Sequence, residues 1–351
     1  MFEQISTPSV LIDLDVAEAN IARYQAYCDA HGLALRPHIK THKLPLLAKK
    51  QIAQGAVGIT CQKISEAEAM LSEGGISDLL LTYNILGQDK RDALKALASK
   101  TRLSVVADNE TVVSGLSQTF TSAPADLDVL VECDTGAGRC GVQSPEDAAK
   151  LALMIDQAPG LTFKGLMTYP PAGQSHAVDQ WLQTAKAQIE ASNLKVEIVS
   201  SGGSPDMWQA HLGTTVTEYR TGTYIYNDRS LVARGVCSFD DCALTILATI
   251  VSRPTPRRAI IDAGSKVLTS DLLGLDGFGH VLGHDELKID QLSEEHGRIV
   301  SEKPIQLSVG DRVRIVPNHA CVVTNMLDEV QLIRGNQFET SSPVVARGRV
   351  W

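Results

Sequence analysis

The sequence lacks the features of a secreted or membrane-spanning protein. Its seven cysteines are odd in number and irregularly spaced, and none forms a CxxC pair, so no disulfide framework is expected. The first residues have neither a basic nor an apolar segment, and therefore give no indication of a signal peptide. No run reaches the ~18 apolar residues that cross a bilayer. We expect a cytoplasmic protein that does not bind membranes.

A basic patch is also missing. The formal net charge is −9, and the acidic residues are spread along the chain rather than gathered in a tail. Nucleic acids and anionic membranes favour clustered lysine and arginine, so neither is an expected partner. A small anionic ligand in a local pocket stays compatible with this charge. The 351 residues are enough for two domains or one large one.

Short apolar runs alternate with stretches of helical length from Pro8 to about Gly222. Continuous apolar runs are typical of strands buried on both faces, and strand–helix alternation indicates parallel βα units. Seven or eight such units predict a closed (β/α)8 TIM barrel. The expected strands are 33–36, 57–60, 79–82, 103–106, 127–131, 161–167 and 196–199, and the expected helices are 46–54, 65–72, 90–98, 109–117, 145–156 and 179–192.

The pattern changes after about Asp228. Helical periodicity becomes weak, and β-type runs separated by turn residues take over. These runs are residues 244–251, 258–261, 313–316 and 322–323. We therefore predict a barrel domain of residues 1–235 and a mainly β domain of residues 236–351, with no linker between them.

A lysine lies where the first predicted strand ends. The segment Arg36–Lys43 brings cationic and imidazole groups directly after that strand. In a parallel barrel this is the C-terminal mouth, where active sites lie. The amine of Lys40 could form a Schiff base there, and His38 or His42 could tune it or transfer protons. Spacing does not decide between Lys40 and Lys43, and both are equally compatible with surface lysines in a loop.

Two glycine-containing loops lie late in the βα array. Ser200–Pro205 follows a predicted strand, and Arg220–Tyr224 lies near another strand end. Glycines let backbone N–H groups converge on an anion, and serine hydroxyls add donors. Either loop alone is typical of an ordinary turn. Two of them in this part of a barrel predict a phosphate-binding site.

A His-x-Cys pair follows the predicted strand 313–316. In an extended chain residues i and i+2 face the same side, so His319 and Cys321 could bind one metal ion. Imidazole and thiolate are ligands that suit zinc. The alternative is a partly buried histidine next to a core cysteine. The polar segment Glu294–Gly297 could bring a carboxylate or His296 to the same place.

Together these segments resemble the fold-type III pyridoxal enzymes, the family that includes D-threonine aldolase and D-serine dehydratase. Their order and spacing are jointly specific, and they span nearly the whole chain. The matching segments are Thr7–Pro8, Leu11–Asp15, Arg36–Lys43, Asp134–Gly141, Ser201–Ser204, Thr221–Tyr224, Asp262–Lys266, Glu294–Gly297 and Pro317–Cys321.

The resemblance implies a role for each matching residue. Lys40 would carry pyridoxal 5'-phosphate, with His38 and Arg139 as catalytic companions and Arg139 near the phenolic oxygen of the cofactor. His319 and Cys321 would bind a divalent metal, which is zinc, manganese or magnesium. The implied cofactor-binding positions are Lys40, Arg139, Tyr169, Ser201, Gly202, Gly203, Ser204, Gly222 and Tyr224. The resemblance also implies an alanine racemase-like barrel, a D-amino acid substrate, and a homodimer in which the partner chain closes each site.

The reaction is left open between two lyase types. In this family a carboxylate at the second metal position goes with aldolases and a cysteine with dehydratases, so Cys321 favours dehydration. The short chain instead resembles the low-specificity D-threonine aldolases. The expected products from a D-3-hydroxy amino acid are glycine plus an aldehyde, or a 2-oxo acid plus ammonia. The alternatives are a racemase or decarboxylase, which need no metal, and a non-enzymatic cofactor-binding protein, against which the C-terminal β extension argues.

Overall fold

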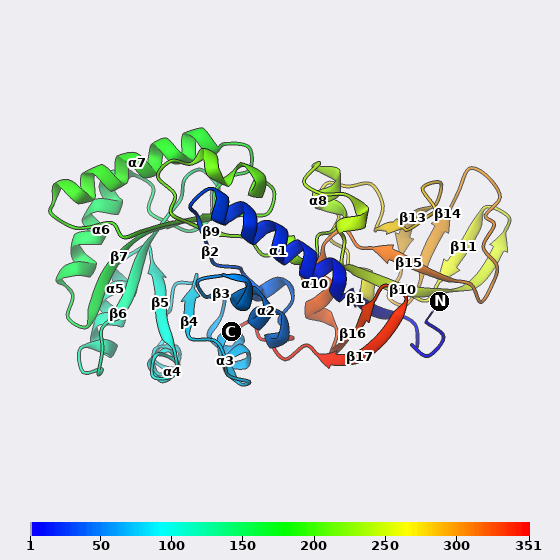
Figure 1. Cartoon of the computed structure of the whole chain (residues 1–351), viewed down its shortest axis with the longest axis horizontal. Helices are drawn as coiled ribbons and strands as arrows, with labels where there is room; N and C mark the ends of the chain where they lie inside the picture. The colour runs from blue at the N-terminus through cyan, green and yellow to red at the C-terminus, as the bar shows by residue number, and fades with distance from the viewer. Residues whose placement is uncertain (1) are drawn as a thin grey trace. The chain divides into compact units, whose positions relative to one another are not determined.

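The computed structural model describes residues 2–351 and contains two compact units (Figure 1). We call them the β unit and the barrel unit. The β unit comprises the chain up to Arg23, Thr41–Leu44 and Thr223–Gly348, and the barrel unit comprises Tyr24–Lys40, Pro45–Gly222 and Arg349–Trp351. The units are therefore interleaved in sequence, whereas a single division after residue 235 was expected. The N-terminal segment lies in the β unit because its first strand pairs there.

The barrel unit is built on eight parallel strands, as predicted. Their order is β2-β9-β8-β7-β6-β5-β4-β3. The two end strands meet through hydrogen bonds from Val57 N to Leu35 O (2.9 Å) and from Thr60 N to Pro37 O (2.7 Å), which close the barrel. The strands are β2 (Ala34–Leu35), β3 (Ile59–Cys61), β4 (Asp78–Leu81), β5 (Arg102–Ala107), β6 (Leu127–Cys133), β7 (Leu161–Thr168), β8 (Ile198–Gly202) and β9 (Glu218–Arg220).

Helices alternate with these strands, and local sequence fixes where they begin. The Asn109 side chain accepts from Val112 N and caps α5, while Ser144 caps α6 by accepting from Asp147 N. The buried side chains of α7 recur every three or four residues, as an amphipathic helix on a sheet requires, and they are Val178, Leu182, Ala185 and Ile189. The helices are α2 (Pro45–Gln54), α3 (Ile64–Leu71), α4 (Gln88–Ala98), α5 (Glu110–Phe120), α6 (Pro145–Gln157) and α7 (Ser175–Ala191), preceded by α1 (Leu14–Ala30).

The β unit contains a nine-stranded sheet. Its path is β13-β14-β11-β10-β1-β16-β17, and β15 pairs with β10 and β12. The β-type runs predicted at 244–251, 258–261 and 313–316 are confirmed as parts of β10, β11 and β15. The strands are β1 (Ser9–Asp13), β10 (Leu244–Thr255), β11 (Arg258–Ile261), β12 (His280–Val281), β13 (Lys288–Leu292), β14 (Gly297–Val300), β15 (Arg312–Val316), β16 (Glu329–Arg334) and β17 (Gln337–Pro343).

The prediction of a strand at 322–323 is wrong, because these residues lie in helix α10 (Ala320–Met326). The helix begins where the carboxylate of Asp228 accepts from Ala320 N at 3.1 Å. This buried acceptor satisfies one of the backbone donors that a helix start leaves free. A contact from 92 positions away thus overrides the strand preference of Val322 and Val323.

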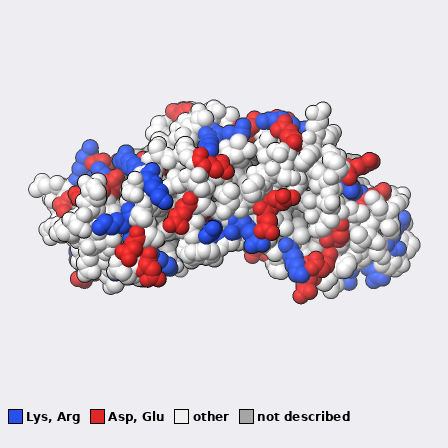
Figure 2. All heavy atoms as spheres, turned by 90° about the horizontal axis from the view of Figure 1, so that it is seen from below, with Lys and Arg blue, Asp and Glu red and all other residues white. Residues whose placement is uncertain are grey.

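The described surface has mixed charge. Figure 2 shows basic and acidic side chains interspersed on the face that it presents. Among residues 2–351, no helix is both long and apolar enough to span a bilayer.

Candidate active site

Lys40 lies at the C-terminal mouth of the barrel, in the short 3-10 turn Ile39–Thr41 that follows β2. Its side chain is exposed, and its amine makes no hydrogen bond or ion pair with any other group in residues 2–351. Lys43 differs in both respects. It is buried in the β unit, where its amine donates to Asn325 Oδ1 (2.7 Å) and Ala346 O (3.1 Å). Of the two candidate lysines, only Lys40 presents an amine that is not already bound.

His38 lies beside this lysine as a buried, neutral imidazole. Its Nε2 is 3.2 Å from Gln62 Oε1, and its Nδ1 accepts from Lys40 N at 3.4 Å. Burial, reinforced by the charge of Lys40, holds the pKa of His38 well below its usual range, although the Gln62 hydrogen bond opposes this. At neutral pH this imidazole is therefore uncharged and can accept a hydrogen bond.

Arg139 and Tyr169 meet at the same mouth. The guanidinium carbon of Arg139 lies 4.5 Å from the centre of the Tyr169 ring, which is a cation–π distance. Its terminal nitrogen is 3.9 Å from Glu132 Oε1. Burial raises the pKa of Glu132 to about 7, against the opposing charge of Arg139 and with the like charge of Asp108. Arg139 is thus placed between an aromatic face and a buried carboxyl group.

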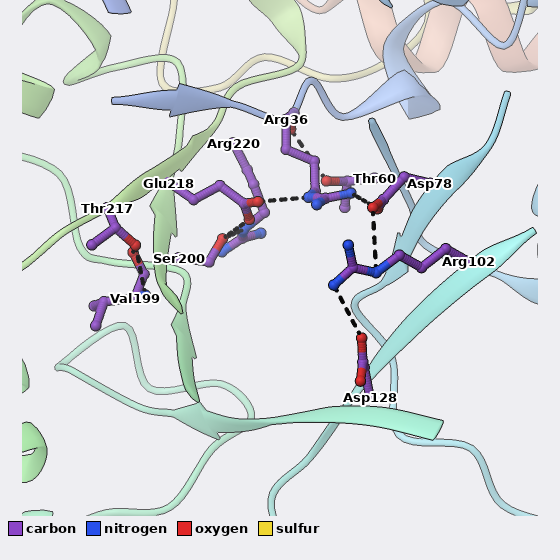
Figure 3. Close-up of polar contacts among 10 residues, drawn as sticks. All are labelled: Arg36, Thr60, Asp78, Arg102, Asp128, Val199, Ser200, Thr217, Glu218 and Arg220. Atoms are coloured by element: carbon purple, nitrogen blue, oxygen red, sulfur yellow. Dashed lines mark hydrogen bonds and ion pairs between the residues drawn. The ribbon is translucent and has the colours of Figure 1, made fainter. Parts of the chain in front are cut away.

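Arg220, in β9, is a second cation inside the barrel. Its Nε donates to Ser200 Oγ (2.8 Å), and a terminal nitrogen donates to Thr168 O (2.5 Å), as Figure 3 shows in part. Burial lowers the pKa of Arg220 to about 10, although the charges of Glu218 and Glu132 raise it. Sequence reasoning missed Arg220 and Glu132 as site residues. The signal for Glu132 was a charged residue directly after the apolar residues 129–131 of the same strand.

The loop after β8, the predicted phosphate-binding loop, is open at Gly203. Gly203 has a φ of +116°, a conformation that favours glycine, and an added Cβ would have no neighbour closer than 3.8 Å. Its N–H already donates to Arg220 O (2.9 Å), so this glycine contributes space rather than that donor. The Ser204 hydroxyl pairs with Thr221 Oγ1 at 2.8 Å, while Ser201 is buried.

A cavity of about 220 Å³ lies beside this loop, and Gly202, Gly203 and Tyr169 are among the residues that line it. Gly202 is required for packing, because an added Cβ would lie 2.0 Å from Arg220 O. Of the other two predicted positions, Gly222 ends the barrel unit, and Tyr224 is buried in the β unit.

His319 and Cys321 come together in the β unit, but not in an extended chain. His319 is the N-cap of α10 and Cys321 is in its first turn, and an N-cap side chain reaches residues two or three positions onward. The two side chains are hydrogen-bonded, and His319 Nδ1 lies 2.7 Å from Asp271 Oδ2. Burial lowers the pKa of His319, but Cys321 and Asp271 outweigh burial and raise it to about 9.

The surroundings of this pair favour metal binding. The Cys321 sulfur lies 3.1 Å from Thr41 Oγ1 and 3.6 Å from Thr223 Oγ1, two hydroxyls that can donate to a thiolate. Asp271 binds one ring nitrogen of His319, so the other ring nitrogen can bind a metal ion. Zinc-binding histidines are held in the same way. The His319 imidazole is held in place by Asp271, and the Cys321 sulfur lies beside two hydroxyl groups. Together the nitrogen and the sulfur are ligands that fit zinc.

The segment Glu294–Gly297 was a further candidate for a place beside this pair. Glu295 forms an exposed ion pair with Lys266 (2.5 Å), and within residues 2–351 neither Glu295 nor His296 hydrogen-bonds to His319 or Cys321. The backbone of this turn instead packs on Gly264, where an added Cβ would lie 2.3 Å from Glu294 O.

Comparison with known proteins gives matches over both parts of the chain. Residues 12–230 match the family of the alanine racemase N-terminal domain, and residues 243–333 match the putative serine dehydratase domain. The 3-hydroxy-D-aspartate aldolase of Paracoccus denitrificans (strain Pd 1222) is 35% identical over 368 residues, which cover 99% of this chain and 93% of that protein.

Solved structures of both reaction types are similar to this chain. The D-threonine aldolase from Filomicrobium marinum superposes with a TM-score of 0.92 at 31% identity, covering 100% of this chain and 98% of that one. The D-threo-3-hydroxyaspartate dehydratase from Delftia sp. HT23 gives a TM-score of 0.87 at 28% identity over 97% of each chain. A dehydratase of that name, solved in a metal-free form with a cysteine replaced by alanine, gives 0.86.

Proposed function

Because this chain belongs to the fold-type III pyridoxal-phosphate lyases, the family of the D-threonine aldolases and D-serine dehydratases, we propose that it binds its cofactor at Lys40 and acts as a lyase on D-3-hydroxy amino acids. The observation that carries the proposal is the exposed, unbound amine of Lys40 at the barrel mouth, beside a neutral His38. The relatives named are lyases, and they give no support to a racemase, a decarboxylase or a non-enzymatic protein.

The barrel mouth offers the groups that pyridoxal phosphate needs. Lys40 provides the amine, Arg139 a cation against the ring oxygen, and Tyr169 an aromatic face. The space beside Gly203, which has a positive φ, and the hydroxyl of Ser204 suit the phosphate. The remaining proposed contacts are Ser201, Gly202, Gly222 and Tyr224. When bound, the cofactor supplies an electron sink for the charge left at Cα.

His319 and Cys321 are the proposed ligands of a divalent metal. A thiolate is a soft ligand, so the pair favours zinc over magnesium or manganese. A metal held by two protein ligands keeps open positions and supplies Lewis-acid chemistry to a hydroxyl group. Asp271 holds the His319 ring in place, and Thr41 supports the Cys321 sulfur.

Aldol cleavage is the first candidate reaction. The support is the 35% identity to a hydroxyaspartate aldolase and the TM-score of 0.92 to a D-threonine aldolase. Dehydration is the second candidate, and Cys321 is the observation that favours it. A cysteine in the His-x-Cys pair matches the expectation for dehydratases, and a dehydratase structure is similar to this chain with a TM-score of 0.87.

Product analysis distinguishes the two reactions. The purified protein, supplied with pyridoxal phosphate and zinc, is incubated with D-threonine and with D-serine. Glycine plus acetaldehyde identifies an aldolase, whereas a 2-oxo acid plus ammonia identifies a dehydratase. Borohydride reduction and peptide mapping should place the cofactor on Lys40. Lys40→Ala should abolish the adduct, and an adduct that persists in Lys40→Ala but disappears in Lys43→Ala would overturn the assignment.

We further propose a homodimer, following the resemblance in the sequence. Light scattering of the protein saturated with cofactor should give twice the 37.7 kDa chain mass. A fully active monomer would contradict this proposal.

A further inference from the structure

A chain of buried polar groups crosses the barrel interior below the mouth (Figure 3). The carboxylate of Glu218, in β9, accepts from Arg36 Nε (2.7 Å) and from Ser200 Oγ (2.6 Å). Ser200 Oγ in turn accepts from Arg220 Nε (2.8 Å). Arg220 also donates to Thr168 O. Glu218 therefore connects Arg36, which lies between β2 and Lys40 in the sequence, with the Arg220 guanidinium below the mouth.

The direction of these hydrogen bonds is fixed by Glu218. An ionised carboxylate can only accept, so Ser200 must give its single hydrogen to Glu218. The Ser200 oxygen then presents its lone pairs to Arg220 Nε. If the carboxylate became an amide, Ser200 could rotate its hydrogen toward another acceptor, and the acceptor for Arg220 would no longer be assured.

This arrangement is not needed simply to fill the barrel. Glu218 is 4% exposed, Ser200 0% and Arg220 6%, and buried charges can often be replaced by apolar side chains without loss of stability. The backbone also makes room for the charges. An added Cβ at Gly58 would lie 2.6 Å from an Arg36 guanidinium nitrogen, so glycine is required beside that group.

The Arg220 guanidinium lies near the proposed cofactor site, since it donates to the carbonyl of Thr168, the residue before Tyr169. Its charge acts on His38, and Glu132 and Arg139 act on Arg220 in turn. His38 and Arg139 are both at the mouth beside Lys40, so a turn of the Arg220 guanidinium changes the field at that site.

We propose that Glu218 is a positioning residue for the lyase reaction, orienting Arg220 through Ser200 and tying it to Arg36. This inference rests on the proposed function of the barrel mouth. Glu218 touches neither substrate nor cofactor in this scheme, and acts only through the two residues that it holds.

The same network controls the charge of Arg220. Burial already lowers the pKa of Arg220 to about 10, and the negative charge of Glu218 is the largest effect opposing burial. Without that charge, the pKa of Arg220 falls further and the guanidinium loses its proton at a lower pH. The titratable and charged groups that face Arg220 are Glu218, Glu132, Arg139, Tyr219 and His38.

The test compares three variants of the full-length protein loaded with pyridoxal phosphate and zinc. Glu218→Gln removes the charge with little change in shape, and Ser200→Ala removes the link to Arg220 but leaves the Glu218–Arg36 pair. Asp128→Asn is the matched control. Asp128 accepts from Arg102 at 3.4 Å, and Arg102 is joined to Arg36 only through Asp78, so Asp128 lies at the end of the network away from Arg220 (Figure 3). The borohydride adduct at Lys40 and the urea unfolding curve are measured for each.

Glu218→Gln should keep the adduct, lower kcat about tenfold with little change in KM, and move the alkaline limb of the kcat profile to lower pH. Ser200→Ala should lower kcat similarly, and it decides the matter if Glu218→Gln does not fold. Asp128→Asn should match the wild type. Two results would overturn the role of Glu218 and leave the proposed function standing. One is a wild-type kcat and pH profile in Ser200→Ala, and the other is equal behaviour of Glu218→Gln and Asp128→Asn. A wild-type protein without adduct or turnover would instead refute the proposed function, and this inference with it.

Discussion

Replacing Glu132 by glutamine should make the cofactor-free protein more stable at alkaline pH. Burial raises the pKa of the Glu132 carboxyl group from 4.5 to about 7, so the folded protein holds this proton more tightly than the unfolded chain. Stability therefore falls as pH rises from about 4.5 to about 7, because ionisation favours the unfolded state. Because glutamine has a similar shape and cannot ionise, the Glu132→Gln variant should not lose this stability as the pH rises.

The expected size follows from the two pKa values. Ionisation of Glu132 costs about 1.4 kcal/mol at pH 5.5 and about 3.4 kcal/mol at pH 8.5, so the difference is about 2 kcal/mol. This free-energy difference is not reduced for screening by solvent, because Glu132 is only 3% exposed. The lost contact with Arg139 changes little, since that side chain is 50% exposed and 3.9 Å away, and such pairs are worth about 0–1 kcal/mol.

Urea unfolding at pH 5.5 and 8.5 measures this difference. All three tryptophans, Trp181, Trp208 and Trp351, lie in the barrel unit, so their fluorescence follows the unit that contains Glu132. The wild type should lose about 2 kcal/mol more than Glu132→Gln between these pH values. Asp134→Asn is the control. The backbone N–H groups of the following loop outweigh the small effect of burial and lower the pKa of that carboxyl group, so it is ionised at both pH values. Parallel pH dependence in wild type and Glu132→Gln would refute the reasoning.

Three further outcomes are expected. Asp228→Ala removes the buried acceptor of Ala320 N, and should lower the unfolding free energy by about 1–2 kcal/mol and increase zinc loss on dialysis; unchanged zinc retention would contradict the role of this contact. Gly264→Ala forces a Cβ to 2.3 Å from Glu294 O and should cost about 1–3 kcal/mol, whereas Gly213→Ala, whose Cβ would come no nearer than 3.1 Å to any atom, should cost less. Chelation of the metal should abolish lyase activity and leave the cofactor absorbance, and turnover that survives complete metal removal would refute the metal hypothesis.

The strands that were predicted from the sequence are those whose central residues are apolar. In β5, for example, Val105 and Val106 are fully buried in a continuous apolar run, which is what a parallel strand covered on both faces requires. Strand β9 was missed for the opposite reason. Glu218 and Arg220 are two of its three residues, and their charges are satisfied only by partners on other strands. A polar network inside a barrel leaves no apolar pattern in the sequence.

His319 and Cys321 lie together as expected, but at the start of a helix and not in an extended chain, and their binding of a metal stays a prediction. The two residues are neighbours in sequence, but the groups that orient them are distant. Asp271 is 48 positions from His319, and Asp228 reaches the same helix from 92 positions away. No periodicity links such residues, so only the folded chain shows that α10 rather than a strand presents Cys321.

The choice between two lysines three residues apart also depends on the fold. Lys43 has a φ of +55°, and its amine is bound by an amide oxygen and a carbonyl in the β unit. An amine that donates to two buried oxygens has lost its freedom to attack a carbonyl group, and freeing it would leave those oxygens without their partner. Lys40 ends the barrel-unit segment with its amine unbound. A nucleophilic amine must be free to react, and this requirement supports the proposal that Lys40 rather than Lys43 carries the cofactor.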